Sequence, residues 1–400
     1  MNRSKAIQNI VEEYGPKNPT IEENPTTLPL ALPSFGKAEV EEALDALLSG
    51  WLTMGKRVFQ FEKDWADYIG TKHAIAVNSG SSALLVMLSA LIECGDLKKG
   101  QEVIVPAVGW STSLFSVAQA GLVPVLADVD AKTLSLSGRY DRPVLAIHML
   151  GNPACVESPL LMEDACGAHG AKIGEKKAGS IGVCGAFSFF FSHHITTGEG
   201  GMITTDRDDL ADACRSIRAH GWIRERSDAQ EWIEAYPNID SRFLFASAGF
   251  NMRMTEISGA FGIHQVKRME EFVRQRNENH RIWCELIEAA NLPIQVFPEM
   301  EGTRHAAFGF PLVLTDESPL SRDQLSAFLE EKNIQTRPIS GANLAIQPAF
   351  AKLDKAIILG DLPIATRVQE RGIFVGQSHG FSKAHGLLLL RALQEAFAET

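Results

Sequence analysis

The sequence predicts an α/β fold in which helices cover a large, mostly parallel sheet. From about residue 37 to about residue 265, short β-rich runs alternate with helical patterns, which is typical of βαβ units. The chain has 400 residues, of which 45% are hydrophobic and 22% charged. That length and composition predict a globular enzyme of two or three domains with a large buried core.

Each element follows from a local pattern. Apolar residues at helical spacing predict the helices, whereas short β-rich runs ended by proline, glycine or acidic residues predict the strands. The expected helices of the first part are 38–48, 81–91 and 114–120. The expected strands are 73–77, 102–106, 124–130, 143–150, 160–165, 186–191 and 201–205.

A smaller C-terminal α/β domain is expected to follow the sheet domain. A long, charge-rich helical stretch at 255–290 leads into a strand at 308–314, and helices are expected at 321–332 and 384–399. The predicted division is therefore an N-terminal arm at 1–28, a large domain at 29–265, and a linking helix with the small domain at 266–400.

Charge and composition exclude several classes of protein. The net charge is 38 − 49 = −11, which argues against a main role in binding nucleic acid or anionic membrane. No apolar run approaches the roughly 18 residues of a membrane span, and the polar N-terminus lacks a signal peptide. The six cysteines form no CxxC pair, so we expect a cytoplasmic protein with reduced thiols and no metal site.

A small-residue turn, NSGSSA at 78–83, follows a strand and opens a helix. Backbone N–H groups at such a turn can approach an anion, and the helix N-terminus adds favourable partial charge. Gly80, Ser81 and Ser82 are therefore candidates for a phosphate cradle. A plain turn capped by serine explains the same residues equally simply.

A strand that ends in a carboxylate is the second candidate. The stretch MEDACGAHG at 162–170 places Asp164 at the end of an expected strand, where open α/β sheets carry functional groups. Asp164 is either a cofactor partner, a base or metal ligand, or simply a helix N-cap.

Two adjacent histidines form the third candidate, within FSFFFSHHITTGEGGM at 187–202. In an extended chain His193 and His194 would point in different directions, so they are poor joint ligands for one metal. One of them is either a buried structural histidine or a general base, since imidazole exchanges protons near neutral pH.

Together, GSSAL, PAVGWST, EDA, SFFFSHHITTGEGG and GFNMRMTEI occur in the order and spacing of a known family. In these motifs the chain resembles the DegT/DnrJ/EryC1/StrS sugar aminotransferases from about residue 29 to the C-terminus. The resemblance implies the fold type I, aspartate aminotransferase-like architecture and dependence on pyridoxal 5′-phosphate (PLP).

The informative departure is at His193, where the family normally has the lysine that holds PLP as a Schiff base. No lysine occurs between Lys177 and Lys267, so none can take over by a small shift. This exchange is similar to the 3-dehydratase branch of the family, as are VPAVGWST, MLGNP, RAHGW and TRPISGANL. The cofactor, PLP or its amino form PMP, is then expected to bind without a covalent bond. The stretch 222–250 contains no cysteine, so no iron–sulfur cluster is expected.

The resemblance also implies residue roles. Asp164 should pair with the pyridinium nitrogen, Trp110 should stack on the cofactor ring, and Ser81 and Ser188 should bind its phosphate with help from Gly80 and Ser82. Asn251 matches a residue that reaches the phosphate from the neighbouring subunit, which implies a homodimer with shared sites. His220 and Arg337 are candidates for substrate contact. Gly167 departs from the usual Gln, Glu or Asp beside the cofactor's phenolic oxygen, and His169 is one option to replace that contact.

The function implied is that of a lyase in dideoxysugar and O-antigen biosynthesis. Glutamate would supply the amino group, and the C3 hydroxyl of a nucleotide-linked 4-keto-6-deoxyhexose, expected to be GDP-4-keto-6-deoxy-D-mannose, would leave to give a 4-keto-3,6-dideoxy sugar. His193 would remove the proton from the cofactor's C4′ carbon. Two alternatives stay open: an aminotransferase that makes a 4-amino sugar, and a PLP-fold regulator without catalysis.

Overall fold

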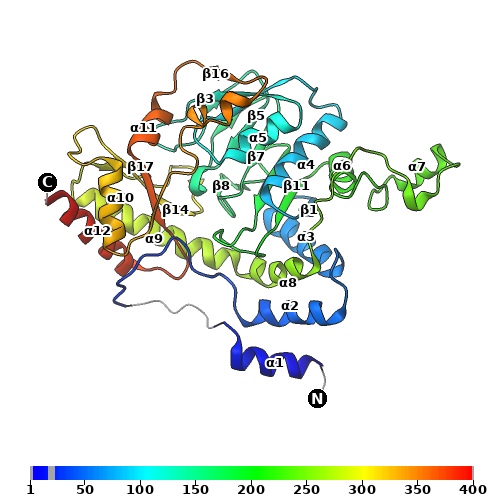
Figure 1. The fold of residues 1–400 in the computed structure, drawn as a ribbon, viewed down its shortest axis with the longest axis horizontal. Helices are drawn as coiled ribbons and strands as arrows, with labels where there is room; N and C mark the ends of the chain where they lie inside the picture. Colours follow the sequence, from blue (N-terminus) through cyan, green and yellow to red (C-terminus); the bar gives the residue numbers. More distant parts are fainter. Residues whose placement is uncertain (1–2, 17–22, 399–400) are drawn as a thin grey trace.

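The computed structural model describes residues 3–16 and 23–398. The predicted N-terminal arm, 1–28, therefore lies partly outside the described residues. Within it, α1 (Arg3–Tyr14) is an amphipathic helix that packs on α2 (Lys37–Ser49) through Ile7 and Val11 (Figure 1).

An eight-stranded sheet forms the centre of the molecule (Figure 1). Only β11 runs against its neighbours; the other adjacent pairs of this sheet are parallel, which confirms the mostly parallel α/β architecture. In spatial order, its strands are β1 (His73–Val77), β11 (Gly201–Thr205), β10 (Cys184–Ser188), β7 (Leu161–Asp164), β5 (Val144–Ile147), β2 (Glu102–Pro106), β3 (Val123–Ala127) and β16 (Ile357–Leu359).

Helices cover the sheet on both faces, so most of its strands are buried along nearly their whole length. The almost wholly apolar α4 (Gly80–Glu93) packs on β10 and β11 between α5 (Ser111–Gln119) and α6 (Asp208–Arg218). A second core lies around Phe61 and Trp65 of α3 (Lys56–Ile69), against which α8 (Glu256–Gln265) packs.

A four-stranded antiparallel sheet forms the C-terminal part, with α9 (Met269–Ala289) packed on α12 (Lys383–Ala398). Leu28 joins this core and pairs with Ile334, so the chain just before the large domain lies against the C-terminal part. Its strands and remaining helices are β12 (Ile294–Gln295), β14 (Gly309–Leu314), β17 (Gly372–Gly376), β15 (Thr336–Pro338), α10 (Arg322–Glu331) and α11 (Pro363–Arg371).

The remaining strands make two small sheets beside the main one. They are β4 (Gly138–Arg139) with β6 (Val156–Glu157), and β13 (Thr303–Arg304) with β8 (Lys172–Ile173) and β9 (Lys176–Lys177). β16, which follows residue 265, nevertheless pairs with β3 at the edge of the large sheet. The division at residue 265 stays a prediction, but β16 shows that the chain returns to the large sheet after it.

Two predicted elements differ in extent. The strand expected at 186–191 ends at Ser188, because the chain turns there and Phe190 and Phe191 lie exposed in a loop. The helix expected at 255–290 is interrupted by a 3-10 turn at Val266–Arg268, which separates α8 from α9. Within residues 3–16 and 23–398, no helix combines the length and the apolar character that crossing a bilayer requires.

Candidate active site

The candidate residues gather at one edge of the large sheet. β1, β10, β7 and β2 run in the same direction, so their carboxyl ends meet at that edge. The turn that precedes Ser81 follows β1, Ser188 ends β10, Asp164 ends β7 and Trp110 follows β2. The topology therefore brings together four of the residues that the sequence singles out.

Close backbone packing shapes the small-residue turn. A Cβ on Gly80 would lie 2.6 Å from the Cβ of Ser188 and 3.0 Å from the Sγ of Cys166, so only glycine fits there. The backbone N–H groups of Gly80 and Ser81 begin α4 and have no acceptor within the helix. These two donors and the Ser188 hydroxyl suit a phosphate at the positive end of the helix.

The expectation for Ser82 needs a correction. Its backbone N–H donates to the Oγ of Ser79, the N-cap of α4, at 3.1 Å. The cap therefore occupies the amide that the sequence assigned to the cradle. The serine cap, one of the two alternatives that the sequence left open, is therefore present, and the phosphate cradle on Gly80 and Ser81 stays a prediction.

Asp164 is held in one orientation. It is 5% exposed, its Oδ1 accepts the backbone N–H of Cys166 at 3.1 Å, and its Oδ2 accepts the Ser113 hydroxyl at 2.5 Å. Ser113 is fully buried on the first turn of α5 and was missed by sequence reasoning. The only signal for it was its place three residues after Trp110.

Trp110 is the N-cap residue of α5 and is 61% exposed. A tryptophan this exposed at the edge of a site offers its indole face to a flat ring. The neighbouring Gly109 allows the close approach of Ile147, whose Cδ1 would lie 2.4 Å from a Cβ at that position.

The loop between β10 and β11 carries the adjacent histidines and is fixed at its base. Phe189 donates to the carbonyl of Gly200 and accepts from the N–H of Thr197, both at 2.9 Å. The N–H of His193 donates to the Phe190 carbonyl at 3.0 Å, which makes a turn. The segment is therefore not extended, as the sequence reasoning assumed.

Because of this turn, the two histidines do not point in opposite directions. The ring of His193 lies 5.0 Å from that of Phe308 and 5.8 Å from that of His169, and the ring of His194 lies 5.0 Å from that of His169. His194 is fully buried, with its Nε2 3.0 Å from the carbonyl oxygen of Ala306. His194 is thus committed to a structural hydrogen bond.

His193 is the histidine that can exchange a proton with the site. It is partly exposed, and its Nδ1 is buried without a hydrogen-bond partner among the described residues, which leaves Nε2 available. Burial, and secondarily the positive charge of Arg276, lowers the pKa of His193 to about 3. The imidazole is therefore a neutral base at physiological pH.

The space at Gly167 is open toward an aromatic ring. A Cβ there would meet only the ring of Phe308, at 3.9 Å, which is an ordinary contact. His169 is fully buried, with its ring 5.3 Å from that of Trp65 and 5.6 Å from that of Phe187. His169 thus belongs to an aromatic cluster, and neither of its ring nitrogens has a hydrogen-bond partner among the described residues.

The substrate candidate His220 lies in a polar cluster with Asn251. His220 has a φ of +66°, a left-handed conformation rare for a residue with a side chain. The Nη2 of Arg253 lies 3.4 Å from the Nε2 of His220 and donates to the Oδ1 of Asn251 at 3.4 Å. Arg253, which sequence reasoning did not single out, adds a positive charge beside both.

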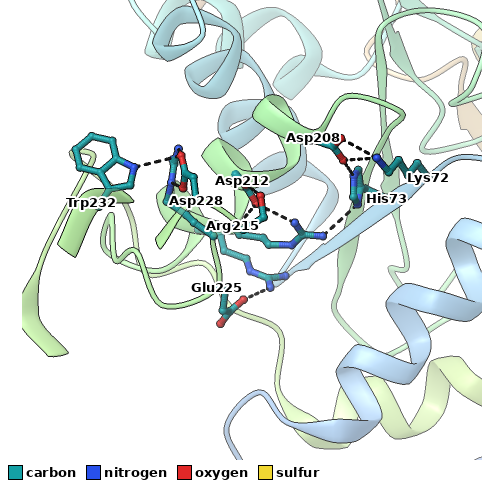
Figure 2. A network of polar contacts seen from close by, with 11 residues as sticks. Lys72, His73, Asp208, Asp212, Arg215, Glu225, Asp228 and Trp232 are labelled. Atoms are coloured by element: carbon teal, nitrogen blue, oxygen red, sulfur yellow. Dashed lines mark hydrogen bonds and ion pairs between the residues drawn. The ribbon is translucent and has the colours of Figure 1, made fainter. Parts of the chain in front are cut away.

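This cluster lies at the base of a projecting segment, residues 222–250, which contains α7 (Ala229–Ala235) and extends away from the body (Figure 1). Polar contacts anchor its start to α6 (Figure 2). Asp212 accepts the backbone N–H of Ser227 at 3.0 Å, and Glu225 pairs with the buried Arg218. Since α6 ends directly before His220, this network also fixes the position of that histidine.

Arg337 is placed differently. It lies on β15, and its guanidinium donates to the Thr336 carbonyl at 2.6 Å and lies 3.9 Å from Glu330. Among the described residues, no hydrogen bond or ion pair joins Arg337 to Asp164 or His193. The structure does not bring it into direct contact with the other candidates.

These residues fit pyridoxal phosphate. The turn at Gly80, which has no room for a Cβ, lies at a helix N-terminus, and the oriented carboxylate of Asp164 lies at a strand end. The exposed indole of Trp110 lies at the same edge of the sheet. A phosphate, a pyridinium nitrogen and an aromatic ring need these three partners.

Known proteins are similar to this chain in sequence and fold. Residues 33–386 match the DegT/DnrJ/EryC1/StrS aminotransferase family. The GDP-4-keto-6-deoxy-D-mannose 3-dehydratase of Yersinia pseudotuberculosis is 36% identical over 371 residues, which are 87% of this chain and 93% of that protein.

Two solved structures are similar throughout. A mutant of GDP-4-keto-6-deoxymannose-3-dehydratase with bound GDP-perosamine has a TM-score of 0.84 at 30% identity, covering 92% of this chain and 100% of that one. The same type of enzyme with a trapped PLP-glutamate geminal diamine has a TM-score of 0.81 at 30% identity, with coverages of 93% and 100%. The chain belongs to the DegT/DnrJ/EryC1/StrS aminotransferase family.

Proposed function

We propose that this protein is a PLP- and PMP-dependent 3-dehydratase of a nucleotide-linked 4-keto-6-deoxyhexose. The expected substrate is GDP-4-keto-6-deoxy-D-mannose, the amino donor is glutamate, and the product is a 4-keto-3,6-dideoxy sugar. The similarity to the Yersinia pseudotuberculosis enzyme and to the two dehydratase structures supports this assignment.

One observation carries the proposal: a neutral imidazole stands where the family has its lysine. His193 reaches the site with Nε2 available, and no lysine occurs between Lys177 and Lys267. A lysine amine would compete for the cofactor's aldehyde and favour ordinary transamination. An imidazole supplies a base without that competing nucleophile.

The other residues have binding roles in this proposal. Asp164, oriented by Ser113, holds the pyridinium nitrogen, Trp110 covers one face of the ring, and Ser81 and Ser188 hold the phosphate. Bound PLP supplies an aldehyde that takes up an amino group and a ring that withdraws electrons from the adjacent carbon. His193 takes a proton beside that ring, and in its charged form it can return the proton to the departing hydroxyl.

A homodimer with shared sites is part of the proposal. Asn251 would complete the partner's phosphate site, while His220 and Arg337 would contact the nucleotide sugar. In support, Asn251 and His220 lie in one cluster with Arg253 at the base of the projecting segment. A cytoplasmic location likewise stays a prediction.

The test is a panel of nucleotide-linked 4-keto-6-deoxyhexoses offered to the PLP-loaded enzyme with glutamate, with products identified by mass spectrometry. We expect a deoxygenated product and ammonia. His193→Asn should lose this activity, whereas His194→Asn, the matched neighbour, should lose stability more than turnover because it disturbs only a structural hydrogen bond.

The two alternatives give different outcomes. A 4-amino sugar formed in stoichiometric amounts would replace the proposal with an aminotransferase. If glutamate failed to bleach the aldehyde absorbance of bound PLP, the protein would be a binding module without catalysis.

A further inference from the structure

Arg276, on α9, is a buried cation without a buried anion. It is 1% exposed, and among the described residues it forms no ion pair. Its Nη1 donates to the backbone carbonyls of Ala307 at 3.2 Å, Phe308 at 3.4 Å, and Gln377. Burial lowers the pKa of Arg276 to about 9, so the guanidinium is still charged at neutral pH. An unpaired charge inside a protein is costly, so a packing role alone accounts poorly for it.

Two of the three carbonyls that Arg276 holds belong to the segment 306–308, which contacts both histidines of the site. The Ala306 carbonyl oxygen lies 3.0 Å from the Nε2 of His194. The Phe308 ring lies 5.0 Å from that of His193, tilted by 37°. A shift of this segment would therefore move the surroundings of His193 directly.

A second tether comes from the next residue of α9. Asn277 accepts the N–H of Ala307 through its Oδ1 at 3.1 Å, and its Nδ2 donates to the His305 carbonyl. α9 thus holds the segment by a charged side chain and by an uncharged one. This pair separates the effect of tethering from the effect of charge.

Among the groups that influence the pKa of His193, a positive charge is present and a negative charge is not. The titratable groups beside it are His169 and His194, and burial lowers the pKa of both. The positive charge of Arg276 lowers the pKa of all three imidazoles further. No carboxylate contributes to the pKa of His193, so no nearby group favours its protonation.

We propose that Arg276 is a positioning residue for His193: through the segment 306–308 it holds Phe308 against the imidazole, and it places a positive charge in the same enclosed region. The inference rests on the proposed role of His193 as the base. The charge keeps the imidazole neutral, and the tether keeps its ring in place.

The test compares Arg276→Met, Arg276→Lys and Asn277→Ala. In each, the protonation of His193 is followed by histidine-selective carbon-13 NMR of the cofactor-free protein, from about pH 8 down to about pH 2.5, so that the wild-type midpoint near pH 3 is covered. His193→Asn assigns the signal. We expect the midpoint of His193 to rise in Arg276→Met but to stay at its wild-type value in Arg276→Lys and in Asn277→Ala. A midpoint in Arg276→Met equal to that of wild type would overturn the electrostatic part.

Phe308→Leu removes the ring contact that the tether maintains while Arg276 stays intact, and it serves if Arg276→Met does not fold. We expect kcat to fall by about 10- to 100-fold while KM for the sugar stays within about twofold, because a base slightly out of place loses rate rather than binding. An unchanged kcat would overturn the positioning role. Full dehydration by His193→Asn would instead refute the role of His193 as the base, whereas a 4-amino sugar formed by the wild-type protein would refute the proposed function. In either case the NMR result would still decide what Arg276 does to the pKa of His193.

Discussion

Replacement of Gly80 by alanine tests the phosphate cradle. The added Cβ would lie 2.6 Å from the Cβ of Ser188, closer than two carbon atoms can approach, so the turn or β10 must shift. Overpacking of this kind costs about 1–3 kcal/mol, and alanine returns at most about 1 kcal/mol through its helix propensity. If the remaining cost of up to about 2 kcal/mol falls on the cofactor-bound state, PLP affinity should drop by up to about 30-fold, since each 1.4 kcal/mol is tenfold.

The assay is a titration of cofactor-free protein with PLP, followed by absorbance, together with thermal unfolding. Gly167→Ala is the matched control, because the same methyl group there meets only Phe308 at an ordinary 3.9 Å. We expect Gly167→Ala to bind PLP within a few-fold of wild type. Equal PLP affinity and equal stability of the two variants would refute the close-packing argument.

Three further predictions concern the base, the dimer and pH. His193→Lys should bind PLP covalently and absorb in the visible region, while dehydration falls by about 10²–10⁴-fold because the imidazole is lost; a variant with wild-type dehydration would contradict the role of His193. Mixing an Asn251→Ala chain with a Ser188→Ala chain should restore part of the activity through hybrid dimers with one intact site; no recovery after verified subunit exchange would count against shared sites. Burial lowers the pKa of His280 to about 4, whereas the unfolded chain protonates near about 6.5. As pH falls, the unfolded state therefore binds the proton first, and the free energy of unfolding should decrease by roughly 3 kcal/mol between about pH 6.5 and about pH 4. In urea unfolding, the stability of His280→Gln should depend less on pH than that of wild type. The same pH dependence in both proteins would contradict this prediction.

Much of the architecture was accessible from sequence because its signals are local. The buried runs of β1, β2 and β7 and the Gly/Ser turn before α4 are visible as residue patterns, and they place the GSS turn, Trp110 and Asp164 at strand ends. The parallel order of these strands then brings the residues together, as the alternating pattern predicts.

The features that the sequence did not predict depend mainly on contacts between residues that are far apart in the chain. The contacts of Ser113 with Asp164, and of Arg276 with the segment 306–308, join residues far apart in the chain, and no periodicity marks them. The aromatic run at 187–191 has the composition of a strand, yet the turn after Ser188 exposes Phe190 and Phe191. The loop that carries His193 is likewise held by a distant contact, because the backbone N–H of Thr196 donates to the Oε1 of Gln265, 69 residues away.

The position of β16 constrains how the molecule can move. Ile357, Ile358 and Leu359 pair with β3 of the large sheet, while β14 and β17, on either side of them in the chain, belong to the C-terminal sheet. Rotation of the C-terminal part about α9 would have to strip β16 from β3. Any domain closure that moved the C-terminal sheet would therefore have to break this row of backbone hydrogen bonds or bend the segments on either side of β16.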